Sequence, residues 1–292
     1  MIDSEAPKNT RALFVDANDP NYDDVAETYG DDFINSVGSE IVAILTPQSG
    51  THALDVGAGR GAVTRALVAN RIETWAIDLS PRMIDQIQTI IPPSRCLVGD
   101  CGDLPFSNES FDSVTAGYVL TVAPDRTQEM LAEWHRVLKS GGRLAVSEPG
   151  PIHADWLWLH ELAASFFKRP GPLEHNRQLK SERENILHAA TQLGFTRRSE
   201  AMYRNPIRFD QIEAAFQYLS VSGLESGWKQ LSDSESHQFR TRVRAGLCEM
   251  FESKNMIVVD RCAALLLFEK RGSARIRDGI RHIESKAEHL DG

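Results

Sequence analysis

The stretch ALDVGAGRGAVTRALV, residues 53–68, decides the fold of this 292-residue chain. An apolar run comes first, then three glycines within five residues (Gly57, Gly59 and Gly61), then a segment with helical periodicity. Glycine lets the backbone turn tightly and approach a ligand, and a strand that enters a helix through such a turn opens many nucleotide-binding α/β sheets. The stretch therefore predicts a ligand site at the first strand-to-helix turn.

Short apolar runs continue this rhythm along the next hundred residues. Between residues 51 and 149 longer helical segments separate five runs rich in β-branched residues, which read THALDV, ETWAID, RCLVGD, SVTAGYVL and RLAVSEP. Nearly continuous apolar runs are typical of parallel strands that helices cover on both faces. The predicted fold class is therefore α/β, with a doubly wound sheet.

After residue 150 helical stretches interrupt the rhythm. We expect helical insertions around the top of the sheet at 150–180 and 207–256, and further strands at TRRSEAMYR and RCAALLLFEK. The helix before the fifth apolar run, RTQEMLAEWHRVLK, is expected to end at a left-handed Gly141 or Gly142. Residues 271–292 read as a charged helix or tail with weak apolar periodicity.

Charge and composition narrow the classes of partner. The net charge is −9, and residues 1–40 hold ten acidic and two basic residues, so the remaining body is nearly neutral. A nucleic-acid-binding protein needs a basic stripe to displace counterions from phosphate, and no long segment supplies one. We therefore expect no nucleic-acid partner.

The cysteines and the hydropathy indicate an intracellular protein. No cysteine pair has a zinc-type spacing among Cys96, Cys101, Cys248 and Cys262, so we expect reduced thiols and no metal. The chain offers neither a secretion signal nor an apolar window of membrane-spanning length. We expect a cytoplasmic protein without a membrane span.

Three acids at expected strand ends distinguish between nucleotide-like ligands. The glycine spacing also fits a dinucleotide, with Asp78 placed to grip a ribose. However, Asp55 directly before the turn suits a cation better than a pyrophosphate, and Asp100 can accept a hydrogen bond from an adenine amine. Together the three acids suit a ligand with a cationic end, a ribose and an adenine but no phosphate, which is S-adenosylmethionine.

With these motifs the chain resembles the class I S-adenosylmethionine-dependent methyltransferases, in the small-molecule group with ubiquinone-, menaquinone- and sterol-type enzymes (methyltransferase type 11). Four stretches carry the resemblance in their order and spacing: LDVGAGRG, IDLSPRMI, GDCGDLPFSNESFDSV and EWHRVLKSGGRLAVSEP. The resemblance implies a Rossmann-like, seven-stranded, mostly parallel sheet with an antiparallel last strand, and helical insertions that form a cap. Its implied division is an N-terminal helical lid (1–50), a cofactor-binding core (51–150), the rest of the sheet with acceptor-binding insertions (151–270) and the tail (271–292).

The resemblance also implies a set of cofactor contacts. These are Asp55, Gly57, Ala58, Gly59, Asp78, Leu79, Met83, Asp100 and Cys101, together with Tyr22 and Tyr29 on a lid formed by residues 20–35. Two departures prevent a transfer of catalytic roles. Thr121 and Val122 stand where many relatives have a histidine, and Gly102 replaces a common acid.

The catalytic and acceptor-binding candidates come from the residues near the expected active edge. Tyr118 can face the methyl donor, and His153 can act as a base, although packing or exposure explains such residues as well. Trp156, Phe166 and Phe167 are expected to line the acceptor pocket.

The predicted function is methyl transfer to an apolar or aromatic small molecule of secondary metabolism, with carbon favoured over oxygen as the acceptor atom. A nicotinamide-dependent reductase and a non-catalytic cofactor-binding protein remain alternatives. The number of subunits stays open, a homo-oligomer included.

Overall fold

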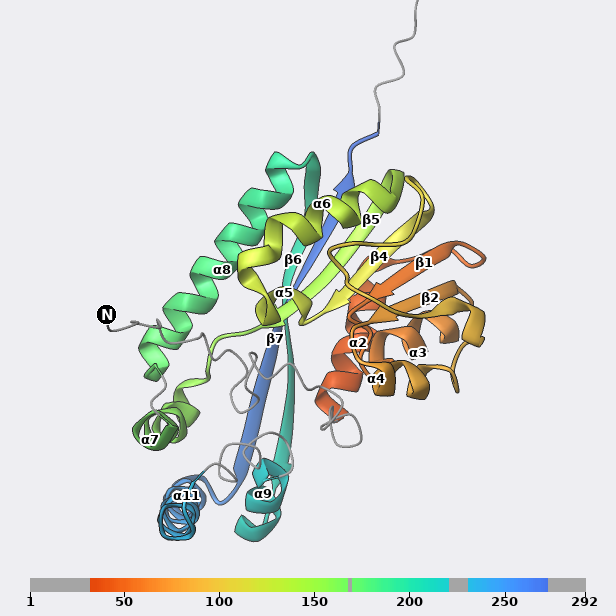
Figure 1. Cartoon of the computed structure of the whole chain (residues 1–292). Helices are drawn as coiled ribbons and strands as arrows, with labels where there is room; N and C mark the ends of the chain where they lie inside the picture. Colours follow the sequence, from red (N-terminus) through yellow and green to blue (C-terminus); the bar gives the residue numbers. More distant parts are fainter. Residues whose placement is uncertain (1–31, 168–169, 221–230, 273–292) are drawn as a thin grey trace, which may run out of the picture.

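A computed structural model of the chain describes residues 32–167, 170–220 and 231–272 (Figure 1). Seven strands form one sheet in the order β3-β2-β1-β4-β5-β7-β6. β7 runs antiparallel to both its neighbours, β5 and β6, and the pairs from β3 to β5 are parallel. The strands are β1 (His52–Val56), β2 (Glu73–Asp78), β3 (Cys96–Val98), β4 (Phe111–Gly117), β5 (Leu138–Pro149), β6 (Phe195–Phe209) and β7 (Ile257–Lys270). The fold class predicted from the sequence is confirmed.

Helices cover both faces of the sheet. Ala53 and Ala145 pack with Val37 and Leu67, whereas Leu54 lies in a second cluster on the opposite face, because successive side chains of a strand alternate. The first face carries α2 (Asp32–Leu45), α3 (Ala62–Ala69) and α4 (Pro81–Ile87). The second carries α5 (Val119–Val122), α6 (Thr127–Val137) and α8 (Pro172–Gln192). Short 3₁₀ turns η1 (Pro93–Arg95), η2 (Pro124–Arg126) and η3 (Ala154–Trp156) complete the connections.

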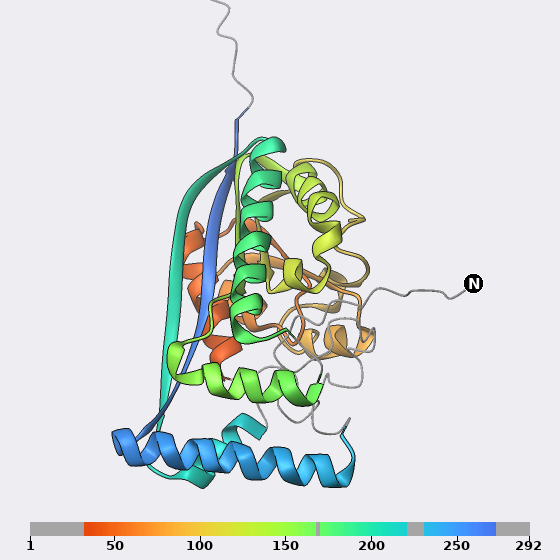
Figure 2. The ribbon, with the colours of Figure 1, turned by 90° about the vertical axis from the view of Figure 1, so that its left-hand side faces the viewer.

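β6 and β7 extend beyond the rest of the sheet as a two-stranded ribbon (Figures 1 and 2). β5 pairs with β7 over residues 263–269, while β6 pairs with β7 over residues 257–270. The far end of the ribbon meets α9 (Ile212–Leu219) and α11 (Asp233–Lys254), and α7 (Leu157–Phe167) packs against α11. We call α7, α9 and α11 the helical cap. It lies within the insertions expected at 150–180 and 207–256, except that residues 207–209 belong to β6 and residues 172–180 begin α8, which covers the sheet.

The expected glycine cap of the helix before β5 is wrong. α6 ends at Val137, and Leu138 already has extended backbone with ψ 136°. Gly141 does adopt a left-handed φ of 77°, but it does so inside the irregular start of β5. There the pairing with β4 jumps from Leu138 to Arg143, so the glycines relieve a bulge rather than end a helix.

The predicted fourth strand is shorter than its apolar run suggests. β4 stops at Gly117, and Tyr118 takes a left-handed φ of 60° before the short helix α5. A tyrosine in this conformation is rare and turns the chain sharply. The apolar residues after it are therefore helical rather than extended.

The described residues contain no helix long and apolar enough to cross a membrane, and no group of three or more metal-type side chains. All four cysteines are free thiols. Residues 273–292 of the charged tail expected at 271–292, and the tyrosines Tyr22 and Tyr29, lie outside the described residues.

Candidate functional site

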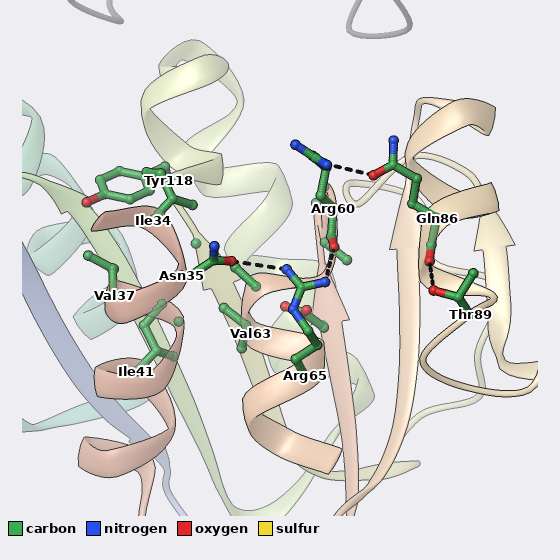
Figure 3. A pocket seen from close by; sticks show the side chains of 17 residues that line it. Ile34, Asn35, Val37, Ile41, Arg60, Val63, Arg65, Gln86, Thr89 and Tyr118 are labelled. Atoms are coloured by element: carbon green, nitrogen blue, oxygen red, sulfur yellow. Dashed lines mark hydrogen bonds between the residues drawn. The ribbon is translucent and has the colours of Figure 1, made fainter. Parts of the chain in front are cut away.

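A cavity of about 340 Å³ lies where β1 and β4 end, between the glycine turn and α2 (Figure 3). The turn and the ends of the two strands contribute Asp55, Gly57, Ala58, Gly59, Arg60, Gly117 and Tyr118. Helix α2 contributes Ile34, Asn35, Val37, Gly38 and Ile41, and the remaining lining residues are Ala62, Val63, Arg65, Gln86 and Thr89. The structure thus brings four of the predicted cofactor contacts into one cavity.

The glycine turn has a conformation that side chains would disturb. Gly57, Gly59 and Gly61 have φ values of 58°, 52° and 81°, all in the left-handed region. A Cβ atom on Gly57 would also lie 2.5 Å from Cγ2 of Val119. The first glycine is therefore required by both backbone conformation and space.

Asp55 is a buried carboxylate in the wall of this cavity, with an exposed fraction of 1%. It is in register with Thr115 on β4, whose hydroxyl donates to Oδ1 at 3.0 Å, and the hydroxyl of Thr64 donates to Oδ2 at 2.6 Å. Burial raises the pKa of Asp55 to about 7, although both hydrogen bonds oppose the rise. A cation in the cavity would favour the charged form.

Asp78 holds the turn against the tip of β2. Its Oδ2 accepts a hydrogen bond of 2.8 Å from the backbone N–H of Gly59, and Oδ1 accepts one of 2.9 Å from that of Ser80. Leu79 beside it has an exposed fraction of 66%, whereas Met83 is buried. Leu79 therefore offers an apolar surface next to the acid, whereas Met83 does not.

Asp100 follows β3 and forms an ion pair with Arg126, a residue that no sequence pattern indicated. Its carboxylate accepts two hydrogen bonds of 2.8 Å, one from Nη2 of Arg126 and one from the N–H of Gly102. Partial burial raises the pKa of Asp100, but these two bonds outweigh the rise, so its pKa lies below the ordinary value. Cys101 is the neighbouring residue, and burial raises the pKa of its thiol to about 12. The acid is therefore ionised at neutral pH and the thiol is not.

Helix α2 forms one wall of the cavity, whereas the sequence indicated only a lid there. Residues 20–31 of that predicted lid lie outside the described residues, and residues 32–35 are the first turn of α2. The close approach of α2 to α3 depends on Gly38, since a Cβ there would lie 2.7 Å from the carbonyl carbon of Ala62. A glycine within this amphipathic segment was the available signal for such packing.

The two catalytic candidates have different positions. Tyr118 lines the cavity beside Ile34 of α2 (Figure 3). His153 is not among the residues that line it. Its Nδ1 accepts a 3.2 Å hydrogen bond from the N–H of Asp155 and so caps the turn η3.

Of the aromatic residues predicted to line the acceptor pocket, Phe166 and Phe167 lie in α7 of the helical cap, and Trp156 lies in the adjoining turn η3 and packs into the same cluster. Phe166 and Phe167 pack edge-on against Phe239 of α11, with ring centroids 5.3 and 5.2 Å apart. Trp156 is buried, and its Nε1 donates a 2.9 Å hydrogen bond to the carbonyl of Val258 on the ribbon. These contacts give each of them a packing role, and their role toward an acceptor stays a prediction.

Comparison with known proteins gives matches centred on the strands and turns of this site. Residues 54–146 match the family described as "Methyltransferase domain". The demethylmenaquinone methyltransferase of Thermotoga maritima is 30% identical over 138 residues, which cover 44% of this chain and 59% of the relative. That of Tropheryma whipplei is 38% identical over 109 residues, covering 34% and 42%. The chain therefore matches about two to three fifths of these relatives.

A solved structure shares the fold. It is the crystal structure of a protein assigned as a methyltransferase in Bacillus halodurans, with a TM-score of 0.52 and 16% identity. The match covers 81% of this chain and 99% of that one. At this identity the likeness concerns the arrangement of the sheet and its helices.

Proposed function

We propose that this chain, whose residues 54–146 form a class I methyltransferase domain of the small-molecule type, transfers a methyl group from S-adenosylmethionine to a small molecule. The observation that carries the proposal is Asp55, a buried carboxylate in the cavity wall directly under the glycine turn. A carboxylate at this place repels a pyrophosphate and attracts a cation. The cavity therefore favours S-adenosylmethionine over a nicotinamide dinucleotide.

The residues present fit this cofactor. Gly57, Ala58 and Gly59 would contact its methionine portion, with Asp55 facing the cationic groups. Asp78 would hold the ribose hydroxyls, and its carboxylate is already fixed by two backbone N–H groups. The adenine would lie against Leu79, with Met83 buried beside it and with Asp100 and Cys101 at its edge. The bound cofactor supplies a methyl group on a positively charged sulfur.

The protein contributes chiefly by alignment and by exclusion of water. An in-line methyl transfer needs the acceptor atom opposite the departing sulfur, and holding two reactants in that geometry removes much of the barrier. Tyr118 reaches the cavity and is our candidate for a residue next to the transferred group. A base is required only where the acceptor must lose a proton. The predicted lid with Tyr22 and Tyr29 would complete the exclusion of water.

For the acceptor we propose an apolar or aromatic molecule of secondary metabolism, methylated at carbon. The helical cap supports this class because its interior is aromatic and aliphatic, built from Trp156, Phe166, Phe167 and their neighbours. Two relatives are named as demethylmenaquinone methyltransferases, which supports a small-molecule acceptor. Aromatic faces stabilise the cation that forms when an alkene or electron-rich ring is methylated, by about 0.5–2 kcal/mol each. Oxygen is the alternative acceptor atom.

Two measurements test the proposal. Calorimetry should show that S-adenosylhomocysteine binds and that NADH and NADPH do not; the reverse result would reject the methyltransferase assignment. Transfer of a ¹³C-labelled methyl group to a panel of apolar acceptors, followed by NMR of the product, identifies the atom. A methoxy or N-methyl shift would reject carbon, and a strongly anionic acceptor would reject the apolar pocket. A cofactor-dependent change in assembly without any turnover would support a non-catalytic binding protein.

A further inference from the structure

The guanidinium group of Arg65 connects the glycine turn to helix α2. Its Nη1 donates a hydrogen bond of 2.8 Å to the backbone carbonyl of Arg60, and its Nη2 donates one of 3.0 Å to Oδ1 of Asn35. Figure 3 shows Arg65 between these two acceptors, and all three residues line the cavity. One side chain therefore contacts the turn and the helix at the same time.

The carbonyl that Arg65 binds belongs to Arg60, in the glycine-rich part of the turn. Arg60 stands between Gly59 and Gly61, both with left-handed φ. Glycine populates many backbone conformations about equally, so a turn rich in glycine needs contacts from outside to keep one of them. Asp78 holds the turn from the side of β2, through the N–H of Gly59, and Arg65 holds it from the side of α2.

The opposite side of α2 is fastened to the β6–β7 ribbon. Phe33 stacks on Tyr203 with ring centroids 6.3 Å apart, and the guanidinium carbon of Arg261 lies 4.4 Å from the centroid of Phe33. Nδ2 of Asn205 donates a 3.3 Å hydrogen bond to the hydroxyl of Ser36. Helix α2 thus stands between the ribbon and the glycine turn, and its position sets the width of the cavity.

We propose that Arg60, Arg65 and Asn35 form a latch that closes the cofactor cavity along α2, and that Arg65 thereby slows release of the bound cofactor. The identity of the ligand rests on the proposed function, whereas the latch between α2 and the turn does not. Arg65 is a positioning residue, because it acts through the turn and the helix. Its planar guanidinium donates to two acceptors in a fixed geometry, which a lysine ammonium on a flexible stem does not reproduce.

The test compares Arg65→Ala, Arg65→Lys and Asn35→Ala with the wild-type chain. The control is Arg177→Ala, which removes an exposed arginine of α8. Two quantities are measured: the dissociation rate of S-adenosylhomocysteine by stopped-flow fluorescence, and hydrogen exchange of the backbone amides of residues 33–45 without ligand. The first reports the effect on the cofactor, and the second reports the latch itself.

Arg65→Ala and Asn35→Ala should release the ligand about three to ten times faster than wild type, as expected for a charge-assisted hydrogen bond near the surface. Association rate and melting temperature should stay unchanged, because the effect lies in residence time. Arg65→Lys should fall between wild type and Arg65→Ala, and a double variant that combines Arg65→Ala with Asn35→Ala should match Arg65→Ala. Exchange in α2 should speed up in both alanine variants and not in the control.

Equal release rates in wild type and Arg65→Ala would overturn the latch and leave the proposed function intact. A loss of melting temperature that accounts for the faster release would also overturn it, since Arg65 would then be merely structural. If the wild-type chain binds no S-adenosylhomocysteine, the proposed function fails. The exchange measurement then decides about the latch, which unchanged exchange in α2 would reject.

Discussion

The turn after β1 and the helical cap are held together by different kinds of contact. The turn is fixed by hydrogen bonds to side chains on several elements, from Asp78 on β2 to Arg65 on α3. The cap is fixed by packed rings around Phe239, which is fully buried. Hydrogen bonds fix direction, whereas apolar packing tolerates exchange of side chains of similar volume. The turn is therefore held in one geometry, whereas the cap tolerates changes among its packed side chains.

Phe239→Ala attacks the cap and should have the largest effect. Removing a buried ring that Phe166 and Phe167 contact should lower the free energy of unfolding by about 3–5 kcal/mol. Affinity for S-adenosylhomocysteine should not change, because the cavity lies elsewhere. Urea denaturation and calorimetry measure the two quantities. Phe239→Leu is the control with a small loss, and a parallel loss of affinity in Phe239→Ala would mean that the two regions are coupled.

Gly57→Val changes the turn and should weaken ligand binding, whereas Phe239→Ala should leave it unchanged. The left-handed φ of 58° and the Cβ position 2.5 Å from Val119 together should weaken binding of S-adenosylhomocysteine by about 2–4 kcal/mol. Gly171→Ala is the control, because nothing lies within 4 Å of a Cβ there. Calorimetry on both variants is the measurement. Wild-type affinity in Gly57→Val would place the ligand outside this cavity.

Asp78→Ala separates the hydrogen bonds of the turn from its shape. Two ribose hydroxyls and the N–H of Gly59 would lose a charged acceptor, so affinity should fall by about 1–3 kcal/mol. Asp78→Asn keeps the volume and one acceptor oxygen and should lose less. Titration calorimetry measures both, and an unchanged dissociation constant in Asp78→Ala would contradict the assignment of this acid to the ribose.

The pH dependence of binding should show the smallest effect. Burial raises the pKa of Asp55 to about 7, and a cationic ligand needs its charged form, so affinity should fall by up to about tenfold as the pH falls from 8 to 6. Because the folded pKa lies above the unfolded value of 3.8, the stability that protonated Asp55 contributes is full below about pH 3.8 and is lost as the pH rises from there through about 7. Asp55→Asn should remove both dependences; if it leaves the affinity profile unchanged, another group titrates.

The glycine turn and the acids at the strand ends could be predicted because their signals are local. Gly57, Gly59 and Asp55 lie within five residues of one another, and the strand ends at Asp78 and Asp100 follow short apolar runs. Parallel strands bring their carboxyl ends to one edge, so local signals on three strands converge. The partner of Asp100, Arg126, lies 26 residues further along the chain and has no spacing rule that would indicate it.

The ends of strands and helices were predicted less well, because a local signal does not show where contacts between elements begin or stop. The glycines at 141 and 142 suit a helix end, yet pairing of β5 with β4 begins at Leu138 and draws them into the strand. Tyr118 continues an apolar run, yet its own left-handed backbone ends β4, and α5 follows directly. At the glycines, sheet pairing outweighed the local preference for a helix end, and at Tyr118 the turn into α5 outweighed the preference for a strand.

The sequence by itself determined the βαβ rhythm, the glycine turn and the acids at the strand ends, because these depend on residue types a few positions apart. Only the tertiary structure decided that α2 forms a wall of the cavity and that Arg65 contacts both Asn35 and the turn. It also decided the state of Asp55, whose pKa depends on burial and on Thr115, 60 residues away in the chain. Burial and long-range hydrogen bonds exist only once the strands have assembled, so no local pattern encodes them.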